Sequence, residues 1–259
     1  MIGFATPTRR TRARLLFAMT LATAACLGGI ALHRASAQTA PDYGRLLAAP
    51  DRSEADREAD KRRDPVPFLV FAAPRPGMTV LDMGAGGGYS TELMARAVGP
   101  SGKVYGQDFD KSARAKERFE ARMKTPAMQN VVVLDRKFDD PLPADAGNLD
   151  LITFWFFYHD TTYMAVDRAA MNKKLFAALK PGAFLVIADH SAKAGAGTSV
   201  GKTLHRIEES TLKSEVEAAG FKLVAEGDFF RHPEDTREER IFGSKVPVDE
   251  FVLKFQKPN

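Results

Sequence analysis

The stretch of sequence that decides the fold covers residues 80–90 and reads Val80-Leu81-Asp82-Met83-Gly84-Ala85-Gly86-Gly87-Gly88-Tyr89-Ser90. An apolar strand that ends in an acid and is followed by glycines and a helix is typical of a nucleotide cradle, because glycines let the backbone approach a ligand. A dinucleotide fingerprint needs a glycine where this chain has Tyr89, and no Lys-Ser or Lys-Thr follows as in a P-loop. Counted from Asp82, the spacing is instead D-x-G-x-G-x-G.

Strand and helix patterns alternate after Gly77, which predicts an α/β fold with a doubly wound, Rossmann-like sheet. Apolar runs indicate five strands, at 79–82, 104–107, 131–134, 149–156 and 183–188. Helices are expected between them at 90–98, 111–124 and 163–179. A last helix at 209–219 and two strands at 221–230 and 250–256 complete a seven-stranded, mostly parallel sheet with an antiparallel last strand.

The residues before this alternation, 38–77, predict a helical extension that serves as a lid or a packing element. A charged helix is expected at 53–63, with acids first and bases last, as the helix dipole favours. Pro65 and Pro67 end it, and an apolar half-helix follows at 68–73. The sequence is therefore divided into a leader (1–37), this extension (38–77) and the main domain (78–259).

Composition and charge limit the classes of function. The chain has 259 residues, 44% of them hydrophobic and 27% charged, which are ordinary globular values. Its net charge of +4 is concentrated in the first 37 residues, which hold five arginines and no acid. Removing these five from the 37 basic residues leaves 32 against 33 acids, so the folded part has no field that would attract nucleic acid.

Residues 1–37 are interpreted as an export signal peptide. A basic region at 9–14 precedes an apolar stretch at 15–32, and Ala35-Ser36-Ala37 is a cleavage pattern of the A-x-A type. Cleavage before Gln38 would place the protein outside the cytoplasm, in the periplasm, without a membrane span. An uncleaved membrane anchor is the alternative. The single cysteine, Cys26, lies in this leader, so no disulfide or thiolate chemistry is expected in the mature chain.

From residue 78 onward the sequence resembles the class I S-adenosyl-L-methionine-dependent methyltransferases. The resemblance rests on the glycine loop, on the acid that ends Val104-Tyr105-Gly106-Gln107-Asp108, and on Leu179-Lys180-Pro181-Gly182 before a strand. It implies that the loop wraps the methionine part of S-adenosylmethionine and that Asp108 holds the ribose hydroxyls. The cofactor-binding residues that follow from it are Asp82, Gly84, Ala85, Gly86, Gly88, Tyr89, Asp108, Phe109 and Asp139.

Two acids are candidates for the adenine-side position in this set. The resemblance implies an acid after the third strand, where the chain offers Asp135 and Asp139. We favour Asp139, because the Pro141-Leu142-Pro143 that follows it resembles the Leu-Pro of the family.

Three histidines are candidates for a catalytic base. Methyl transfer requires an aligned acceptor and, where the acceptor carries a proton, a group that removes it. His159 follows the fourth strand, His190 follows the fifth, and His205 ends a glycine-containing stretch, so all three are expected at the carboxyl edge. His159 is the first candidate and His190 the second. In the alternative interpretation, His159 packs against the cofactor and the others cap loops.

A metal site is a further alternative, although the preferred interpretation contains none. Cation-dependent O-methyltransferases carry metal ligands near the positions of Asp160, Asp189 and His190, and this sequence resembles them in those positions. His159 and His205 could add nitrogen ligands.

The acceptor is expected to be a small molecule. No Asn-Pro-Pro-Tyr follows the fourth strand, as it does in the amino-methylating enzymes of nucleic acids, and the aromatic residues there offer Phe157 and Tyr158 as pocket candidates. The leader, Tyr158-His159-Asp160 and residues 204–208 resemble a group of exported bacterial methyltransferases. The sequence therefore predicts a small-molecule methyltransferase. The alternatives are an exported binding protein that kept the fold and an aminopropyl transferase; the oligomeric state stays open.

Overall fold

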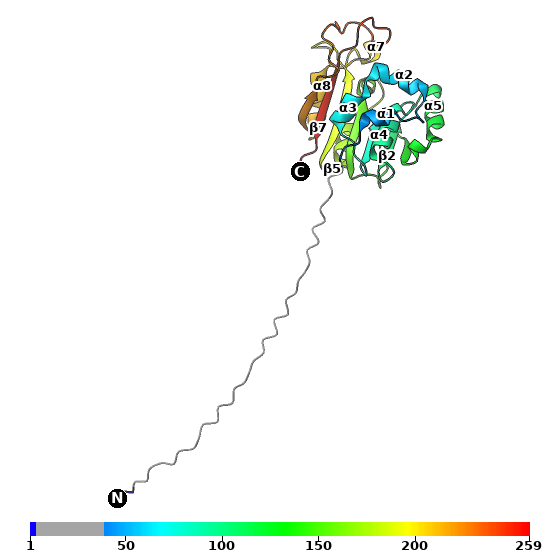
Figure 1. Cartoon of the computed structure of the whole chain (residues 1–259). Helices are drawn as coiled ribbons and strands as arrows, with labels where there is room; N and C mark the ends of the chain where they lie inside the picture. The colour runs from blue at the N-terminus through cyan, green and yellow to red at the C-terminus, as the bar shows by residue number, and fades with distance from the viewer. Residues whose placement is uncertain (4–38) are drawn as a thin grey trace. The chain divides into compact units, whose positions relative to one another are not determined.

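The computed structural model describes residues 1–3 and 39–259, and Gln38–Asn259 form one compact unit (Figure 1). Apart from its first three residues, the predicted export signal lies outside the described residues, as does its cleavage site. In the described part of the chain, no helix is both long enough and apolar enough to cross a membrane.

A seven-stranded sheet forms the centre of this unit, in the order β3-β2-β1-β4-β5-β7-β6. The strands from β1 to β5 are parallel, whereas β7 runs antiparallel to both β5 and β6, which confirms the predicted fold class. The strand order reverses between β1 and β4, which is where open α/β sheets bind ligands. The bounds are β1 Thr79–Met83, β2 Lys103–Asp108, β3 Val131–Asp135, β4 Leu149–Trp155, β5 Leu179–His190, β6 Lys222–Gly227 and β7 Glu250–Gln256.

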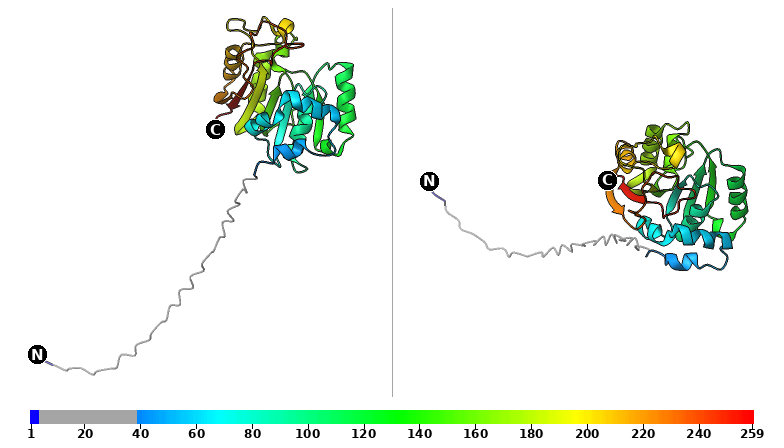
Figure 2. Two further views of the ribbon diagram at one scale, coloured as in Figure 1. Left: turned by 45° about the horizontal axis from the view of Figure 1, so that its top comes forward. Right: turned by 90° about the horizontal axis from the view of Figure 1, so that it is seen from above.

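Helices cover both faces of the sheet (Figure 2). One face packs against α1 (Tyr43–Leu47), α3 (Pro65–Ala72), α4 (Tyr89–Val98) and α5 (Ala113–Met123). The other packs against α6 (Arg168–Ala178) and α8 (Glu209–Glu217). The remaining helices are α2 (Glu54–Arg63), α7 (Gly201–Leu204), η1 (Pro126–Met128) and η2 (Tyr158–Thr162).

The central strands are mostly apolar because each contributes to two cores. In β1, Val80 belongs to the core under α4 while its neighbour Leu81 belongs to the core under α6. In β4, Leu151 belongs to the core under α4 and Ile152 to the core under α6. A strand buried on both faces cannot show polar alternation, which explains why continuous apolar runs located these strands in the sequence.

The N-terminal extension is a packing element of the domain. Phe68 of α3 has no exposed surface and stacks on Trp155 with ring centroids 4.2 Å apart. The charged helix α2 ends at Arg63, and α3 begins with Pro65 after Asp64 takes a left-handed conformation (φ 38°). Proline suits the first position of a helix, where its missing N–H leaves no bond unmade, so the predicted break becomes a turn between two helices.

Three predicted element boundaries were wrong. The helix expected at 163–179 begins only at Arg168, because the side chain of Asp167 caps it by accepting from the Ala170 N–H at 2.9 Å. Leu179 already belongs to β5, where it pairs with Leu149 of β4. The strand expected at 221–230 covers Lys222–Gly227.

A partly buried ion-pair network holds α2 against the domain. Arg122 of α5 contacts Asp56 of α2 at 2.7 Å and also pairs with Glu92 of α4. Its Nε donates to the carbonyl oxygen of Gly87 at 3.2 Å. One guanidinium therefore joins α2, α4 and the glycine loop.

Replacing Arg122 by Ala should lower the free energy of unfolding by about 3–5 kcal/mol, because it leaves the buried Asp56 carboxylate without its ion-pair partner, whereas Glu92 keeps Arg96. Lys61→Ala is the control, since Lys61 and its partner Glu58 are 72% and 69% exposed and such pairs contribute below about 1 kcal/mol. Urea unfolding measures both variants. A loss for Arg122→Ala no larger than that of the control would show that this network does not anchor α2.

Candidate functional site

The glycine loop follows β1 and leads into α4, as predicted. Gly84, Gly86 and Gly88 all have positive φ, of 68°, 51° and 82°. A Cβ atom on Gly84 would lie 2.3 Å from Cγ of Phe157, and one on Gly88 would lie 3.0 Å from Phe119 and Arg122. A Cβ on Gly86 would meet no described atom nearer than the Gly84 carbonyl oxygen at 3.9 Å. The backbone at Gly86 therefore borders open space, where a ligand can approach it.

Asp82 organises this loop from inside. Its carboxylate has no exposed surface and accepts hydrogen bonds from the hydroxyls of Ser90 (2.8 Å), Thr91 (2.7 Å) and Thr153 (3.0 Å). Burial raises the pKa of Asp82 to about 6, against the effect of these three donors. The structure thus gives Asp82 a positioning role, since a fully buried side chain presents no surface to a cofactor.

Asp108 closes the loop from the end of β2. Its Oδ2 accepts from the Gly86 N–H and its Oδ1 from the Phe109 N–H, both at 2.8 Å, and burial raises its pKa. The Ala85 N–H donates to the Gln107 carbonyl oxygen at 2.9 Å, which further joins the loop to β2. Each carboxylate oxygen can accept a second hydrogen bond, so Asp108 can still hold a pair of hydroxyls. The adjacent Phe109 ring is 39% exposed.

Tyr89 lies at the start of α4, where α2 covers it. Its hydroxyl donates to Oδ1 of Asp60 at 2.6 Å, and the Arg63 guanidinium lies 4.9 Å from its ring centroid. Burial raises the pKa of Tyr89 and lowers that of Arg63. A cofactor-binding role for Tyr89 stays a prediction.

The two candidates for the adenine-side acid have different neighbours. Asp135 ends β3, pairs in register with Asp108 and is exposed. Asp139 is half-buried, and its Oδ2 is 3.5 Å from the Asp167 N–H. The choice of Asp139 stays a prediction.

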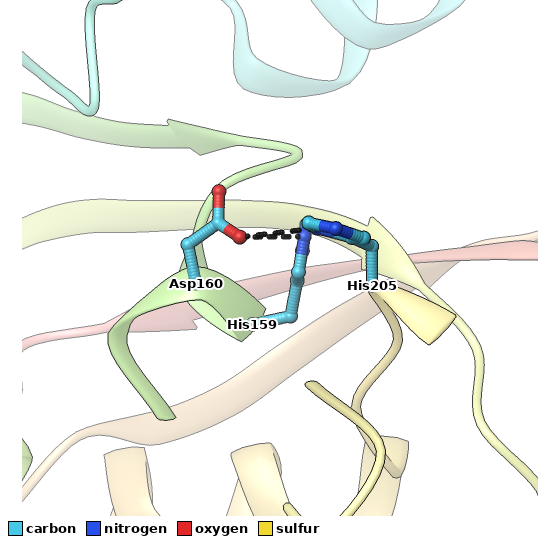
Figure 3. A group of neighbouring side chains, drawn as sticks. All are labelled: His159, Asp160 and His205. Atoms are coloured by element: carbon cyan, nitrogen blue, oxygen red, sulfur yellow. Dashed lines mark ion pairs between the residues drawn. The ribbon is translucent and has the colours of Figure 1, made fainter. Parts of the chain in front are cut away.

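The three candidate histidines come together at the carboxyl edge. The ring centroid of His159, in η2, lies 5.4 Å from that of His190 at the end of β5 and 5.5 Å from that of His205. Figure 3 shows His159 and His205 turned toward Asp160. His205 reaches this place because α7 packs closely on η2, where a Cβ on Gly201 would lie 2.1 Å from Oγ1 of Thr162.

His159 is held by a buried carboxylate. Its Nδ1 lies 2.7 Å from Oδ1 of Asp189, and its backbone N–H donates to Oδ2 of the same residue at 2.7 Å. Burial alone would lower the pKa of His159, but the carboxylates of Asp189 and Asp160 raise it to about 10. Asp189 fixes the orientation of the ring and favours its cationic form.

His190 is buried beside an acid that sequence reasoning missed. Its Nδ1 lies 2.9 Å from Oε1 of Glu250, yet at an angle that gives it no hydrogen-bond partner among the described residues. Burial lowers the pKa of His190 to about 3 and raises that of Glu250 to about 8, so both are neutral near pH 7. The antiparallel register of β5 and β7 pairs these two residues, and no local pattern in the sequence shows that pairing.

The expectation that Tyr158 lines an acceptor pocket was wrong. Its side chain is completely buried under α6 and α8, and its hydroxyl donates to Oε2 of Glu215 at 2.9 Å. The 3₁₀ turn of η2 directs consecutive side chains to different sides, so Tyr158 enters the core while His159 faces the edge. Phe157 is half-buried and stacks on Phe138 with ring centroids 5.0 Å apart.

Comparison with known proteins identifies the class. A family described as a methyltransferase domain matches residues 74–229, so the chain belongs to this family. A demethylmenaquinone methyltransferase from Lactococcus lactis is 33% identical over 115 residues, 44% of this chain and 43% of that protein. The chain spans less than half the length of the curated relatives it matches.

Solved structures share the fold at low sequence identity. A SAM-dependent methyltransferase from Aquifex aeolicus has a TM-score of 0.55 and 21% identity over 83% of this chain and 98% of its own. An arsenic(III) S-adenosylmethionine methyltransferase from Chlamydomonas reinhardtii has a TM-score of 0.57 and 17% identity, over 85% of this chain and 74% of its own.

Family membership implies S-adenosylmethionine as the cofactor, and the residues present fit it. The open backbone at Gly86 can receive the amino-acid part, and Asp108 beside it can accept from two ribose hydroxyls. Both lie next to the point where the strand order reverses, between β1 and β4.

Replacing Asp108 by Ala should weaken the binding of S-adenosylhomocysteine by at least about 100-fold, because two hydrogen bonds to a charged group contribute about 1.5–3 kcal/mol each. Gly86→Val should also prevent binding, since a β-branched residue does not tolerate a φ of 51°. Asp110→Asn is the control: this exposed residue has a φ of 56°, which Asn adopts readily. Calorimetry measures the three variants, and unchanged binding in the first two would place the cofactor elsewhere.

The raised pKa of Glu250 predicts a pH dependence of stability. The folded chain keeps the Glu250 proton up to about pH 8, whereas the unfolded chain loses it near pH 4.5. The contribution of Glu250 to the free energy of unfolding is therefore full below pH 4.5 and is lost as the pH rises to 8. His190 has a lowered pKa in the folded chain, so its contribution to the free energy of unfolding is already complete above pH 6.5 and does not change further. Between pH 6.5 and 8, wild type should therefore lose more unfolding free energy than Glu250→Gln, as measured by urea unfolding. Equal losses would mean that Glu250 is ionised in the folded chain.

Proposed function

We propose that the protein is an S-adenosylmethionine-dependent methyltransferase that acts on a small-molecule acceptor. The observation that carries this proposal is the open backbone at Gly86 directly beside the Asp108 carboxylate, at the same sheet edge as three histidines. When bound, S-adenosylmethionine supplies an electrophilic methyl group. The chain's own residues align the acceptor and take up its proton.

His159 is the base in this proposal. Asp189 orients its ring through Nδ1, which leaves Nε2 as the nitrogen that can accept a proton from an acceptor. The Asp–His pair gives that nitrogen a high proton affinity. Because the pKa of His159 is about 10, the fraction of the unprotonated base grows with pH up to that value.

Aromatic side chains beside the histidines favour an apolar or planar acceptor. The Phe242 ring lies 5.0 Å from that of His205 and is 66% exposed, and the Tyr163 ring lies 6.1 Å away and is 40% exposed. Exposed rings at a site offer apolar contact area to a ligand. Relatives are named for acceptors as different as demethylmenaquinone and arsenite. The proposal therefore names the class of acceptor, a small molecule, and no individual compound.

The place of action in this proposal is outside the cytoplasm. It rests on the basic, apolar and A-x-A segments of residues 1–37. Mass spectrometry of the protein recovered from its native host tests it, since processing would give a chain that begins at Gln38.

His159→Ala should lower kcat by about 10²–10⁴-fold, the usual contribution of a general base, with little change in cofactor affinity. The wild-type rate should rise toward pH 10, and the variant should lack this rise. Transfer of radiolabelled methyl from S-adenosylmethionine to a panel of hydroxyl, thiol and amine acceptors provides the assay. His190→Ala tests the second candidate, and His232→Ala, at a 38% exposed loop position, is the control. Normal turnover in both His159→Ala and His190→Ala would refute the hypothesis that a histidine is the general base.

A further inference from the structure

We propose that His159, Asp160 and His205 form a binding site for one divalent transition-metal ion. Oδ1 of Asp160 lies 3.2 Å from Nε2 of His159 and 3.4 Å from Nδ1 of His205. The three ligand atoms lie within 4.8 Å of one another (Figure 3). Two imidazoles and one carboxylate are a donor set that proteins use for catalytic Zn²⁺ and for non-haem iron.

The distances fit metal coordination without rearrangement of the backbone. Metal–ligand bonds of about 2.0–2.1 Å in a tetrahedral site place neighbouring ligand atoms about 3.3 Å apart. Two of the three separations have this value. The ion therefore needs a rotation of the side chains to bring the third pair closer, and the helical turn and loop can stay in place.

Residues behind the ligands orient them. The Nδ1 of His159 is engaged by the buried Asp189 carboxylate, which directs Nε2 toward Asp160 and His205. A metal ion binds there in exchange for the Nε2 proton. This is the carboxylate–histidine–metal arrangement, in which the second carboxylate fixes the tautomer of the ligand. The hydroxyl of Tyr163 donates to Oδ1 of Asp160, the proposed ligand atom itself, and so fixes where that oxygen lies.

This donor set differs from the metal alternative that the sequence suggested. Asp189 has no exposed surface, and its oxygens accept from the backbone N–H groups of His159 and His190. The Nδ1 of His190 faces Glu250. Asp189 thus belongs behind the site, and His190 lies beside it.

The site is also accessible. The side chains of Asp160 and His205 are 20% and 19% exposed, while His159 at the back is almost fully buried. Three protein ligands leave at least one coordination position open for water or for a hydroxyl or thiol of an acceptor. Metal binding at this site does not depend on methyl-transfer activity. A role of the metal in activating an acceptor, in contrast, rests on the proposed function. The same Nε2 either binds a metal or accepts a proton, and separate measurements distinguish the two.

The test is calorimetric titration of the untagged full-length protein, freed of metal with a chelator, with ZnCl₂ and with MgCl₂. We expect one Zn²⁺ per chain and no Mg²⁺, because Mg²⁺ prefers oxygen ligands. Asp189→Asn should weaken Zn²⁺ binding by roughly 10–100-fold, the cost of losing an orienting partner, and His205→Ala and Asp160→Ala should weaken it further.

His232→Ala is the matched control, since His232 and Glu234 form another histidine–carboxylate pair, 3.3 Å apart, that shares no residue with the proposed site. It should leave Zn²⁺ binding unchanged. His205→Gln and Asp160→Asn replace the alanine variants if those do not fold, and S-adenosylhomocysteine binding by each variant reports an intact domain. Absence of Zn²⁺ binding in wild type, or equal binding in wild type, His205→Ala and Asp160→Ala, would overturn the site. Failure to bind S-adenosylhomocysteine with Zn²⁺ binding intact would instead overturn the proposed function.

Discussion

The buried carboxylate of Asp82 is the constraint on which the cofactor edge depends. Three hydroxyls donate to it, from Ser90, Thr91 and Thr153, and so join β1 to β4 and to the first turn of α4. A buried carboxylate without such partners would be costly, so these bonds fix how the chain turns between strand and helix. The left-handed glycines make that turn possible, and Asp108 closes it from β2.

A second buried carboxylate organises the part of the sheet edge that carries the histidines. Asp189 is the residue before the end of β5 and accepts from the backbone N–H groups of His159 and His190 as well as from the His159 ring. It therefore sets the geometry of both histidines and raises the pKa of His159. The two sides of the edge differ in what their acids do: Asp82 shapes a backbone, whereas Asp189 orients side chains that can carry chemistry.

Much of the fold followed from the sequence, because its signals are local. Apolar runs located the five parallel strands, and alternation of polar and apolar residues located β6 and β7. The start of α6 was missed because the cap of Asp167 and the 3₁₀ turn before it override the helical pattern. Tyr158 was assigned to a pocket because an aromatic residue after a strand looks the same in sequence whether it faces a core or a cleft.

The sequence by itself determined the fold and the position of the glycine loop, because strand, glycine turn and helix start lie within a few residues of one another. The tertiary structure decided which groups surround the histidines. Asp189 is 30 residues from His159, Glu250 meets His190 only through the pairing of β5 with β7, and His205 reaches Asp160 through the contact between α7 and η2. Each of these contacts depends on how distant segments pack, and packing leaves no periodic or spacing signal in the chain.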